Sequence, residues 1–380
     1  MEEVFKQDSF AEIHQRGRLQ ERLAKAHQLF DQRCPGLDRI GIALCDDGLQ
    51  KVKTFLASPA EKNPLTNYQI SLCDAGSLAQ TATSGQVRVV NDLELFAAGE
   101  GEHTRKIWDL GMRSSYTQPI YEAGQLRGFV FFNSRQKSYF ADGILEQVSL
   151  FAHFLVQMVL NHQQALRTLV AALRITGRMM HYKDPETKSH LERMAHFSRL
   201  IAQQMVADGQ IAFDDEEIDH LFRFAPLHDI GKVGIPDDIL LKPGRLDSRE
   251  WRVMKTHSGI GRAIVDQLIE EFGFSTLPDI EILRHITELH HEKLDGSGYP
   301  HGLKNEQVPI AARIISVSDI FDALTTERPY KGAWSNSEAF AELDEMVGDN
   351  LLDPIAVAAL HTNLSEVVEI QGVFSENHRS

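Results

Sequence analysis

The chain has 380 residues, of which 42% are hydrophobic and 24% charged, and this length suits two globular domains of roughly 100–200 residues each. Its formal net charge is −15, from 54 acidic and 39 basic residues. Such a surface disfavours long nucleic acids, because phosphate contacts require Lys and Arg. No run approaches the roughly 18 apolar residues of a membrane span, and the charged start lacks a secretory leader. We therefore expect a cytoplasmic protein without a membrane segment.

The first part of the chain changes from a helical to a strand pattern. Residues 1–33 carry apolar residues at helical spacing, whereas IGIALC (40–45) and KVKTFLAS (51–58) are typical of short strands. The segment 114–134 predicts two antiparallel strands joined by a turn at 122–124. Residues 1–160 are therefore expected to form an α+β domain around an antiparallel sheet.

Residues 144–183 predict one long helix, because they contain no proline and their apolar residues recur at helical spacing. A helix longer than about 25 residues favours a connector between domains or a coiled coil in a homodimer. The alternative is two shorter helices with a bend near His162. Residues 170–370 then predict an all-helical domain, interrupted by loops at 231–248 and 293–309.

Histidines gather in the second half, where 12 of the 17 lie at or after position 181. Glu186 and His190 are four residues apart, which places both on one helix face, although such pairs are common on surfaces. His228 and Asp229 are adjacent in an apolar segment predicted to be helical, where a buried carboxylate needs a cation or donors. Lys232, three residues further on, lies on the same predicted face and can reach a bound phosphate.

Four more candidates follow. His257 alone is typical of a partly buried structural histidine, but His290 and His291 are adjacent at a helix end, and Asp319 lies in an apolar helix. Imidazole and carboxylate suit first-row divalent metals. Two such metals, with Asp229 bridging them, would hold a hydroxide for attack on phosphorus and neutralise charge on the phosphoryl oxygens. No thiolate is present among these residues, which argues against structural zinc.

The chain resembles the HD-GYP family of cyclic di-nucleotide phosphodiesterases over about residues 170–360. Five segments carry the resemblance: DPETKSH, LHDIGKVGIPDDILLKPGRL, MKTHSGIG, HHEKLDGSGYPHGL and ARIISVSDIFDALTTERPYK. It implies eight metal ligands: Glu186, His190, His228, Asp229, His257, His290, His291 and Asp319. The implied metal is iron, with manganese as the alternative. Glu186 favours three ions, although a site with two stays open.

By the same resemblance, Asp229 and Lys232 are catalytic, and Lys232 contacts the scissile phosphate. Arg328 and Lys331 would bind the rest of the substrate; the alternative for these two is ordinary surface charge. The implied reaction is hydrolysis of cyclic di-GMP to linear pGpG, and a second cleavage to GMP stays open. Three alternatives stay open: a preference for the hybrid 3′3′ cyclic GMP-AMP, a receptor with incidental turnover, and another hydrolase of the HD type.

Two further expectations concern the loop 295–300 and the first domain. The loop is expected to brace His290 and His291 or to form a surface for a protein partner. The first domain resembles GAF domains more loosely, as a sensor or as a ligand-free dimerisation module. The predicted fold class is therefore a GAF-like α+β sensor domain followed by an all-α bundle of the HD type.

Overall fold

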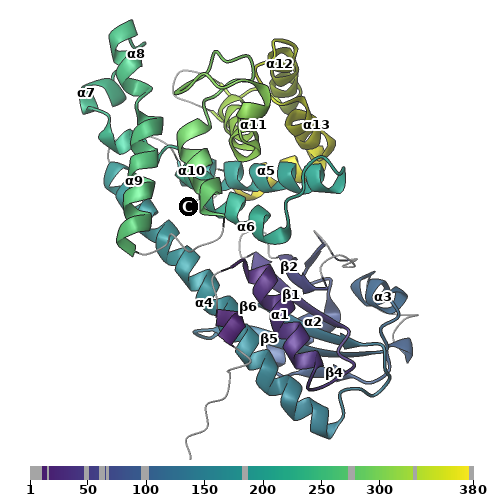
Figure 1. The fold of residues 1–380 in the computed structure, drawn as a ribbon. Helices are drawn as coiled ribbons and strands as arrows, with labels where there is room; N and C mark the ends of the chain where they lie inside the picture. Colours follow the sequence, from purple (N-terminus) through teal and green to yellow (C-terminus); the bar gives the residue numbers. More distant parts are fainter. Residues whose placement is uncertain are drawn as a thin grey trace, which may run out of the picture. The chain divides into compact units, whose positions relative to one another are not determined.

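The computed structural model describes residues 11–14, 17–46, 51–59, 65, 68–95, 102–181, 187–272, 279–327 and 332–375. The chain divides into two compact units, Met1–Ala165 and Leu166–Ser380, whose elements are labelled in Figure 1. This division lies between the first domain expected at 1–160 and the second expected at 170–370.

The amino-terminal unit contains a six-stranded sheet in the order β3-β2-β1-β6-β5-β4. All neighbouring strands pair antiparallel, which confirms the α+β prediction. The predicted hairpin turn lies at Ala123 and Gly124, which have positive φ angles of 49° and 78°. The strands are β1 (Arg39–Asp46), β2 (Lys51–Ser58), β3 (Gln69–Ser71), β4 (Arg88–Val90), β5 (Ser114–Glu122) and β6 (Gln125–Ser134).

The two faces of this sheet differ. Ile40 on β1 pairs with Phe132 on β6, and both lie in an apolar core with Leu23 of α1 (Leu19–Asp31) and Leu155 of α4 (Asp142–His181). Because side chains alternate along a strand, the intervening residues lie on the opposite face. Small apolar clusters there include residues of α2 (Gly76–Ser84) and α3 (Glu102–Asp109). Two 3-10 turns, η1 (Ala11–His14) and η3 (Leu93–Leu95), complete the unit.

Helix α4 is one helix of 40 residues with no interruption near His162, so the alternative of two helices is wrong. Its residues Gly143–Leu173 are long and apolar enough to cross a membrane, by length and composition alone. The expectation that no segment approaches that length is therefore corrected. However, 44% of the most apolar window is buried inside the protein, and the core helix of a soluble protein passes the same test.

The elements in the described residues of the carboxy-terminal unit are all helices, which confirms the predicted all-α bundle. Helix α5 begins after Thr187, whose side chain accepts a hydrogen bond from the backbone N–H of His190 at 3.2 Å. The elements are α5 (Lys188–Ala207), α6 (Asp215–Phe224), η4 (Ala225–Leu227), η5 (Ile230–Gly234), α7 (Asp237–Leu240), α8 (Ser248–Met254), α9 (His257–Phe272), α10 (Ile280–Leu289), η7 (Asn305–Gln307), α11 (Ile310–Thr325), α12 (Asn336–Gly348), α13 (Pro354–Thr362) and α14 (Leu364–Val373).

The core of this unit surrounds α5 and α11. Phe197 of α5 and Phe321 of α11 are fully buried, with ring centroids 5.4 Å apart. Each such aromatic side chain contributes about 1.5–3 kcal/mol when removed from water. This packing fixes His190 and Asp319, which lie on the same two helices.

Candidate metal centre

His228 and Asp229 lie between two 3-10 helices, η4 and η5, and not inside an α-helix as the sequence predicted. Pro226 in η4 has no backbone N–H to donate, which disfavours an α-helix interior. In a 3-10 helix, side chains three residues apart eclipse. Lys232 accordingly lies with its Nζ 2.9 Å from Oδ2 of Asp229.

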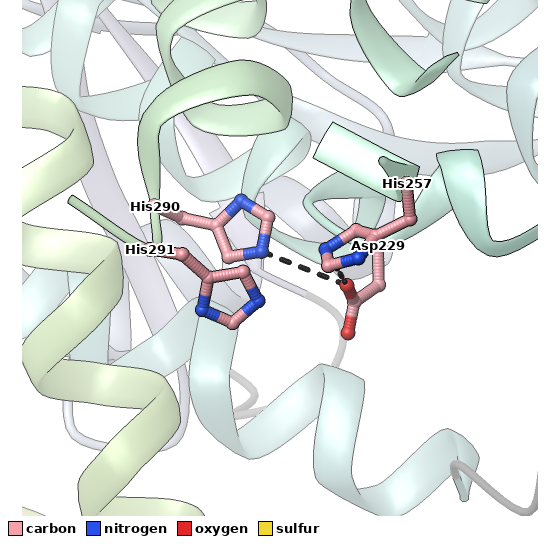
Figure 2. A group of neighbouring side chains, drawn as sticks. All are labelled: Asp229, His257, His290 and His291. Carbon is pink, nitrogen blue, oxygen red and sulfur yellow. Dashed lines mark ion pairs between the residues drawn. The ribbon is translucent and has the colours of Figure 1, made fainter. Parts of the chain in front are cut away.

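Asp229 and three predicted histidine ligands lie close together. Single ligand atoms of Asp229, His257, His290 and His291 all lie within 4.8 Å of one another. We call these four residues the Asp229 cluster, and Figure 2 shows the histidine rings pointing toward the carboxylate. Oδ1 of Asp229 lies 3.1 Å from Nε2 of His257 and 3.6 Å from Nε2 of His290.

Hydrogen bonds to backbone carbonyls set the tautomers of the imidazole rings of His257 and His290. Nδ1 of His257 lies 2.8 Å from the carbonyl oxygen of Met254, and Nδ1 of His290 lies 2.9 Å from that of Ile286. Because a carbonyl oxygen only accepts, each Nδ1 must carry the proton. In its neutral form, each ring therefore presents the lone pair of Nε2 to the centre, as ligating histidines do.

The atoms that face the centre form no hydrogen bonds among the described residues. Oδ1 of Asp229 and the Nε2 atoms of His257 and His290 are buried without a hydrogen-bond partner. A buried acceptor left unsatisfied costs about 1–3 kcal/mol. Since acceptors face acceptors, a cation at this position would satisfy all of them, and the residues present fit a divalent metal ion.

The protonation states support the same interpretation. Burial, and then the neighbouring His290, lowers the pKa of His291 well below its usual value, and burial also lowers the pKa of His290. Burial would raise the pKa of Asp229, but the charges of Lys232 and His228 outweigh this and hold it well below its usual range. Near neutral pH, His290 and His291 are therefore neutral imidazoles beside the ionised carboxylate of Asp229.

A second group of ligand atoms lies in the same unit, formed by His190, His228 and Asp319, and we call it the Asp319 cluster. Nε2 of His190 lies 3.8 Å from Oδ1 of Asp319. Nε2 of His228 lies 3.2 Å from Oδ2 of Asp229. The Asp229 carboxylate thus has one oxygen toward each cluster, which is the geometry expected of a bridging ligand.

Two residues of this region were missed from the sequence. Asp322, fully buried on α11, lies with Oδ2 2.7 Å from Nδ1 of His190. Arg193 donates to Oδ1 of Asp322 at 2.6 Å and to Oδ2 at 2.9 Å. An acidic residue three positions after Asp319 was the available signal, because that spacing places both on one helix face.

The loop 295–300 packs beside the Asp229 cluster. The ring of Tyr299 lies 4.6 Å from that of His291, centroid to centroid, and its backbone N–H donates to the carbonyl of His291. Gly298 is required here, since an added Cβ would lie 2.3 Å from the backbone nitrogen of Lys293. Buried Glu292 accepts hydrogen bonds from the backbone N–H groups of residues 301–303. These contacts agree with the expected bracing of the histidines.

Three predicted site residues lie outside the described residues: Glu186, Arg328 and Lys331. The structure brings together the other predicted site residues, which are His190, His228, Asp229, Lys232, His257, His290, His291 and Asp319. Nitrogen and carboxylate oxygen donors without thiolate suit first-row divalent metals.

Comparisons with known proteins connect this site to a family. Residues 176–355 match the family model of the HD domain. The cyclic di-GMP phosphodiesterase response regulator RpfG of Xanthomonas campestris is 41% identical, over 52% of this chain and 49% of that protein. The cyclic di-GMP phosphodiesterase of Thermotoga maritima is 38% identical, over 53% and 51%. The 3′3′-cGAMP-specific phosphodiesterase 3 of Vibrio cholerae is 39% identical, over 50% and 38%.

The chain spans about half the length of the curated relatives it matches. Among solved structures, a GAF domain of a sensor histidine kinase from Bacillus halodurans matches with a TM-score of 0.32 and 14% identity, over 36% of this chain and 91% of that chain.

Proposed function

Since this chain carries an HD domain at residues 176–355, we propose that it is a metal-dependent phosphodiesterase that hydrolyses cyclic di-GMP to pGpG and then to GMP. The observation that carries the proposal is the pair of adjacent ligand clusters, joined by the two oxygens of Asp229. Two relatives named cyclic di-GMP phosphodiesterases, at 41% and 38% identity, support the substrate class.

We assign the metal ligands by cluster. One ion would be held by the Asp229 cluster and another by the Asp319 cluster, with Asp229 between them. Iron is the proposed metal, with manganese as the alternative, and Glu186 is proposed as a ligand of a third ion. When bound, such ions polarise water and the phosphoryl group and offset the negative charge that develops there.

The chain's own residues would orient and stabilise the reacting phosphodiester. Lys232, fixed by Asp229 at 2.9 Å, places a positive charge beside the clusters and would bind a non-bridging phosphoryl oxygen. Oδ2 of Asp229 would accept a hydrogen bond from the attacking water and orient it toward phosphorus. Arg328 and Lys331 are proposed to bind the other phosphate, because the guanidinium fork and the ammonium both suit it.

The hybrid 3′3′ cyclic GMP-AMP is the second candidate substrate. A relative named as specific for it is 39% identical to this chain, close to the values for the relatives named for cyclic di-GMP. Discrimination between guanine and adenine depends on hydrogen bonds to the base, so only turnover of both substrates decides between them.

The test combines metal analysis with turnover. We expect protein purified anaerobically to contain at least two metal ions per chain and to hydrolyse one of the two cyclic di-nucleotides. The double variant His228→Ala/Asp229→Ala should lose both the metal and the activity. The control is His153→Ala, an exposed histidine in the other unit, which should retain both.

Other outcomes would contradict the proposal. Full metal occupancy and tight binding without cleavage of either substrate would favour a receptor. Hydrolysis of mononucleotides alone would indicate a different hydrolase of the HD type. Turnover that is unchanged in His228→Ala/Asp229→Ala would place the reaction at another site.

A further inference from the structure

Lys293 is a half-buried lysine next to the ligand clusters. It lies two residues after His291, in the segment that follows α10, and its side chain extends to α11. There its Nζ lies 3.3 Å from Oγ of Ser316, a side chain that is only 5% exposed. Ser316 precedes Asp319 by three residues, so both lie on one face of α11. Lys293 therefore connects the segment that carries His291 with the helix that carries Asp319.

The backbone of Lys293 is fixed by the loop 295–300. Its carbonyl oxygen accepts a hydrogen bond of 2.9 Å from the backbone N–H of Gly296. An added Cβ on Gly298 would lie 2.3 Å from its backbone nitrogen. The loop that packs on His291 thus also sets the point from which the Lys293 side chain starts, and the ammonium is directed toward α11.

The ammonium of Lys293 has few partners for a group in this position. An ammonium offers three donors, but among the residues that the structure describes it forms one hydrogen bond, to Ser316, and no ion pair. Burial lowers the pKa of Lys293, whereas the charges of Asp319 and then Asp295 raise it. The chain therefore compensates the desolvation of this ammonium only in part, and two donors remain for an acceptor that the chain does not supply.

The chemistry of the clusters selects an anion as this acceptor. Lys293 would repel the divalent ions that the two clusters suit, because like charges oppose each other strongly in a partly buried site. It therefore does not serve to hold the metal. An ammonium and metal ions instead attract the same anionic oxygens. We propose that Lys293 is a substrate-binding residue, which donates to a phosphoryl oxygen of the scissile phosphodiester beside the Asp319 cluster.

This inference rests on the proposed function and adds a second lysine to it. Lys232 comes from η5 and is paired with Asp229 at 2.9 Å, whereas Lys293 comes from the segment after α10 and has no paired carboxylate among the described residues. Because the two lysines come from different elements, each can bind a different oxygen of one phosphoryl group.

Inorganic phosphate is the probe, because it binds without turnover. It is titrated by calorimetry into the metal-loaded full chain and into Lys293→Met, which keeps the length of the side chain but removes its charge. We expect Lys293→Met to bind phosphate about tenfold or more weakly than the parent chain. Its affinity for metal should be equal or higher, since a repelling charge is removed. A fall in metal affinity without a change in phosphate affinity would show that Lys293 only positions Asp319, and would overturn the inference.

Two further variants keep the test decisive. Lys304→Met removes an exposed lysine from the same segment and should bind phosphate like the parent chain. Ser316→Ala removes the hydroxyl group that orients the ammonium, and should weaken phosphate by about two- to tenfold. This variant carries the test where Lys293→Met fails to fold.

Turnover is measured separately, so that this inference and the proposed function can fail independently. A parent chain that cleaves neither cyclic di-nucleotide, but loses phosphate affinity in Lys293→Met, would contradict the proposed function and support Lys293 as a phosphate-binding residue. The inference is overturned if the parent chain does not bind phosphate or if Lys293→Met binds it equally well. Where Lys293→Met does not fold, unchanged phosphate binding in Ser316→Ala overturns it.

Discussion

Asp322 shows how one buried side chain can control a metal ligand. It is a positioning residue, because it accepts from Nδ1 of His190 at 2.7 Å and is itself held by Arg193. Asp322→Asn keeps the shape but removes the charge that orients the imidazole, so we expect metal affinity at the Asp319 cluster to fall about 10- to 100-fold. Titration of metal into the metal-free protein measures this.

The matched control is Asp349→Asn, an exposed carboxylate on the same unit, which should bind metal like the parent chain. A purely structural role for Asp322 predicts a different result. In that case the midpoint of urea unfolding would fall while metal affinity and turnover stayed unchanged.

The buried histidines predict how stability of the metal-free protein depends on pH. Burial lowers the pKa of both His290 and His291 in the folded state, so below about pH 6.5 the unfolded chain binds protons that the folded protein excludes. The free energy of unfolding should therefore fall as the pH decreases below that value. Burial would raise the pKa of Asp229, but the charge of Lys232 outweighs this and leaves that pKa lowered in the folded state. Protonation of Asp229 therefore decreases the free energy of unfolding only below about pH 4.

Urea unfolding of the metal-free protein at about pH 7.5 and pH 5.5 measures this dependence. His291→Gln removes one of the two buried histidines. The free energy of unfolding should then differ less between the two pH values than it does in the parent chain. An equal difference in the parent chain and His291→Gln would show that His291 does not contribute.

Among the elements, the contact of η5 with α9 decides whether the Asp229 cluster forms. A Cβ on Gly231 would lie 1.8 Å from the carbonyl oxygen of His257 and 2.4 Å from the backbone nitrogen of Gly261. Gly231→Ala must therefore push α9 away, and His257 with it. We expect a loss of about 1–3 kcal/mol in the free energy of unfolding together with loss of bound metal.

Gly259→Ala is the control on the same helix, because a Cβ there meets no atom within 4 Å. It should retain the metal and gain up to about 1 kcal/mol, since alanine is favoured over glycine within a helix. If Gly231→Ala binds metal as the parent chain does, the close approach of η5 and α9 is not what positions His257.

The elements also show why part of the structure could be predicted from sequence. The strands of residues 40–58 and 114–134 alternate on a two-sided sheet, and α4 repeats its apolar residues at helical spacing, so local pattern sufficed. The segment around His228 was predicted to be helical because its composition is apolar. Its 3-10 geometry depends on Pro226 and on the contact of Gly231 with another helix, which no local pattern contains.

The residues of the site also fall into those that the sequence predicted and those that only the fold identified. Adjacent pairs such as His228–Asp229 and His290–His291 stand out in the sequence because those types are rarely buried together. The link between Arg193 and Asp322 joins residues 129 positions apart through the packing of α5 on α11. Arg193 has no local signal that separates it from ordinary helix charges, and the spacing of Asp322 from Asp319 does not show that its partners are His190 and Arg193, so only the fold identified this link.

At the scale of the whole molecule, α4 is the element common to both units. Its residues Val148, Leu155 and Val159 belong to the core of the amino-terminal unit, whereas Leu166 and Leu169 belong to the core of the carboxy-terminal unit. A helix with one stretch in each core offers a continuous backbone through which a rotation could pass. We therefore expect regulation of turnover to pass along α4 toward His190, which lies in the first turn of α5, soon after α4 ends.

Insertions between Ala165 and Leu166, where the two units meet in sequence, test this expectation. One added alanine turns the following helix by about 100°, whereas seven added residues return it to within about 20° of its phase. We expect the single insertion to change turnover by about 5- to 150-fold, the usual range of coupling between sites, and the seven-residue insertion to restore most of it. Metal content should stay constant in both, because each unit keeps its own core. Equal turnover in the parent chain and in both insertion variants would show that α4 only connects the two units. A helix that transmits no rotation gives the same turnover whichever way the following residues are turned.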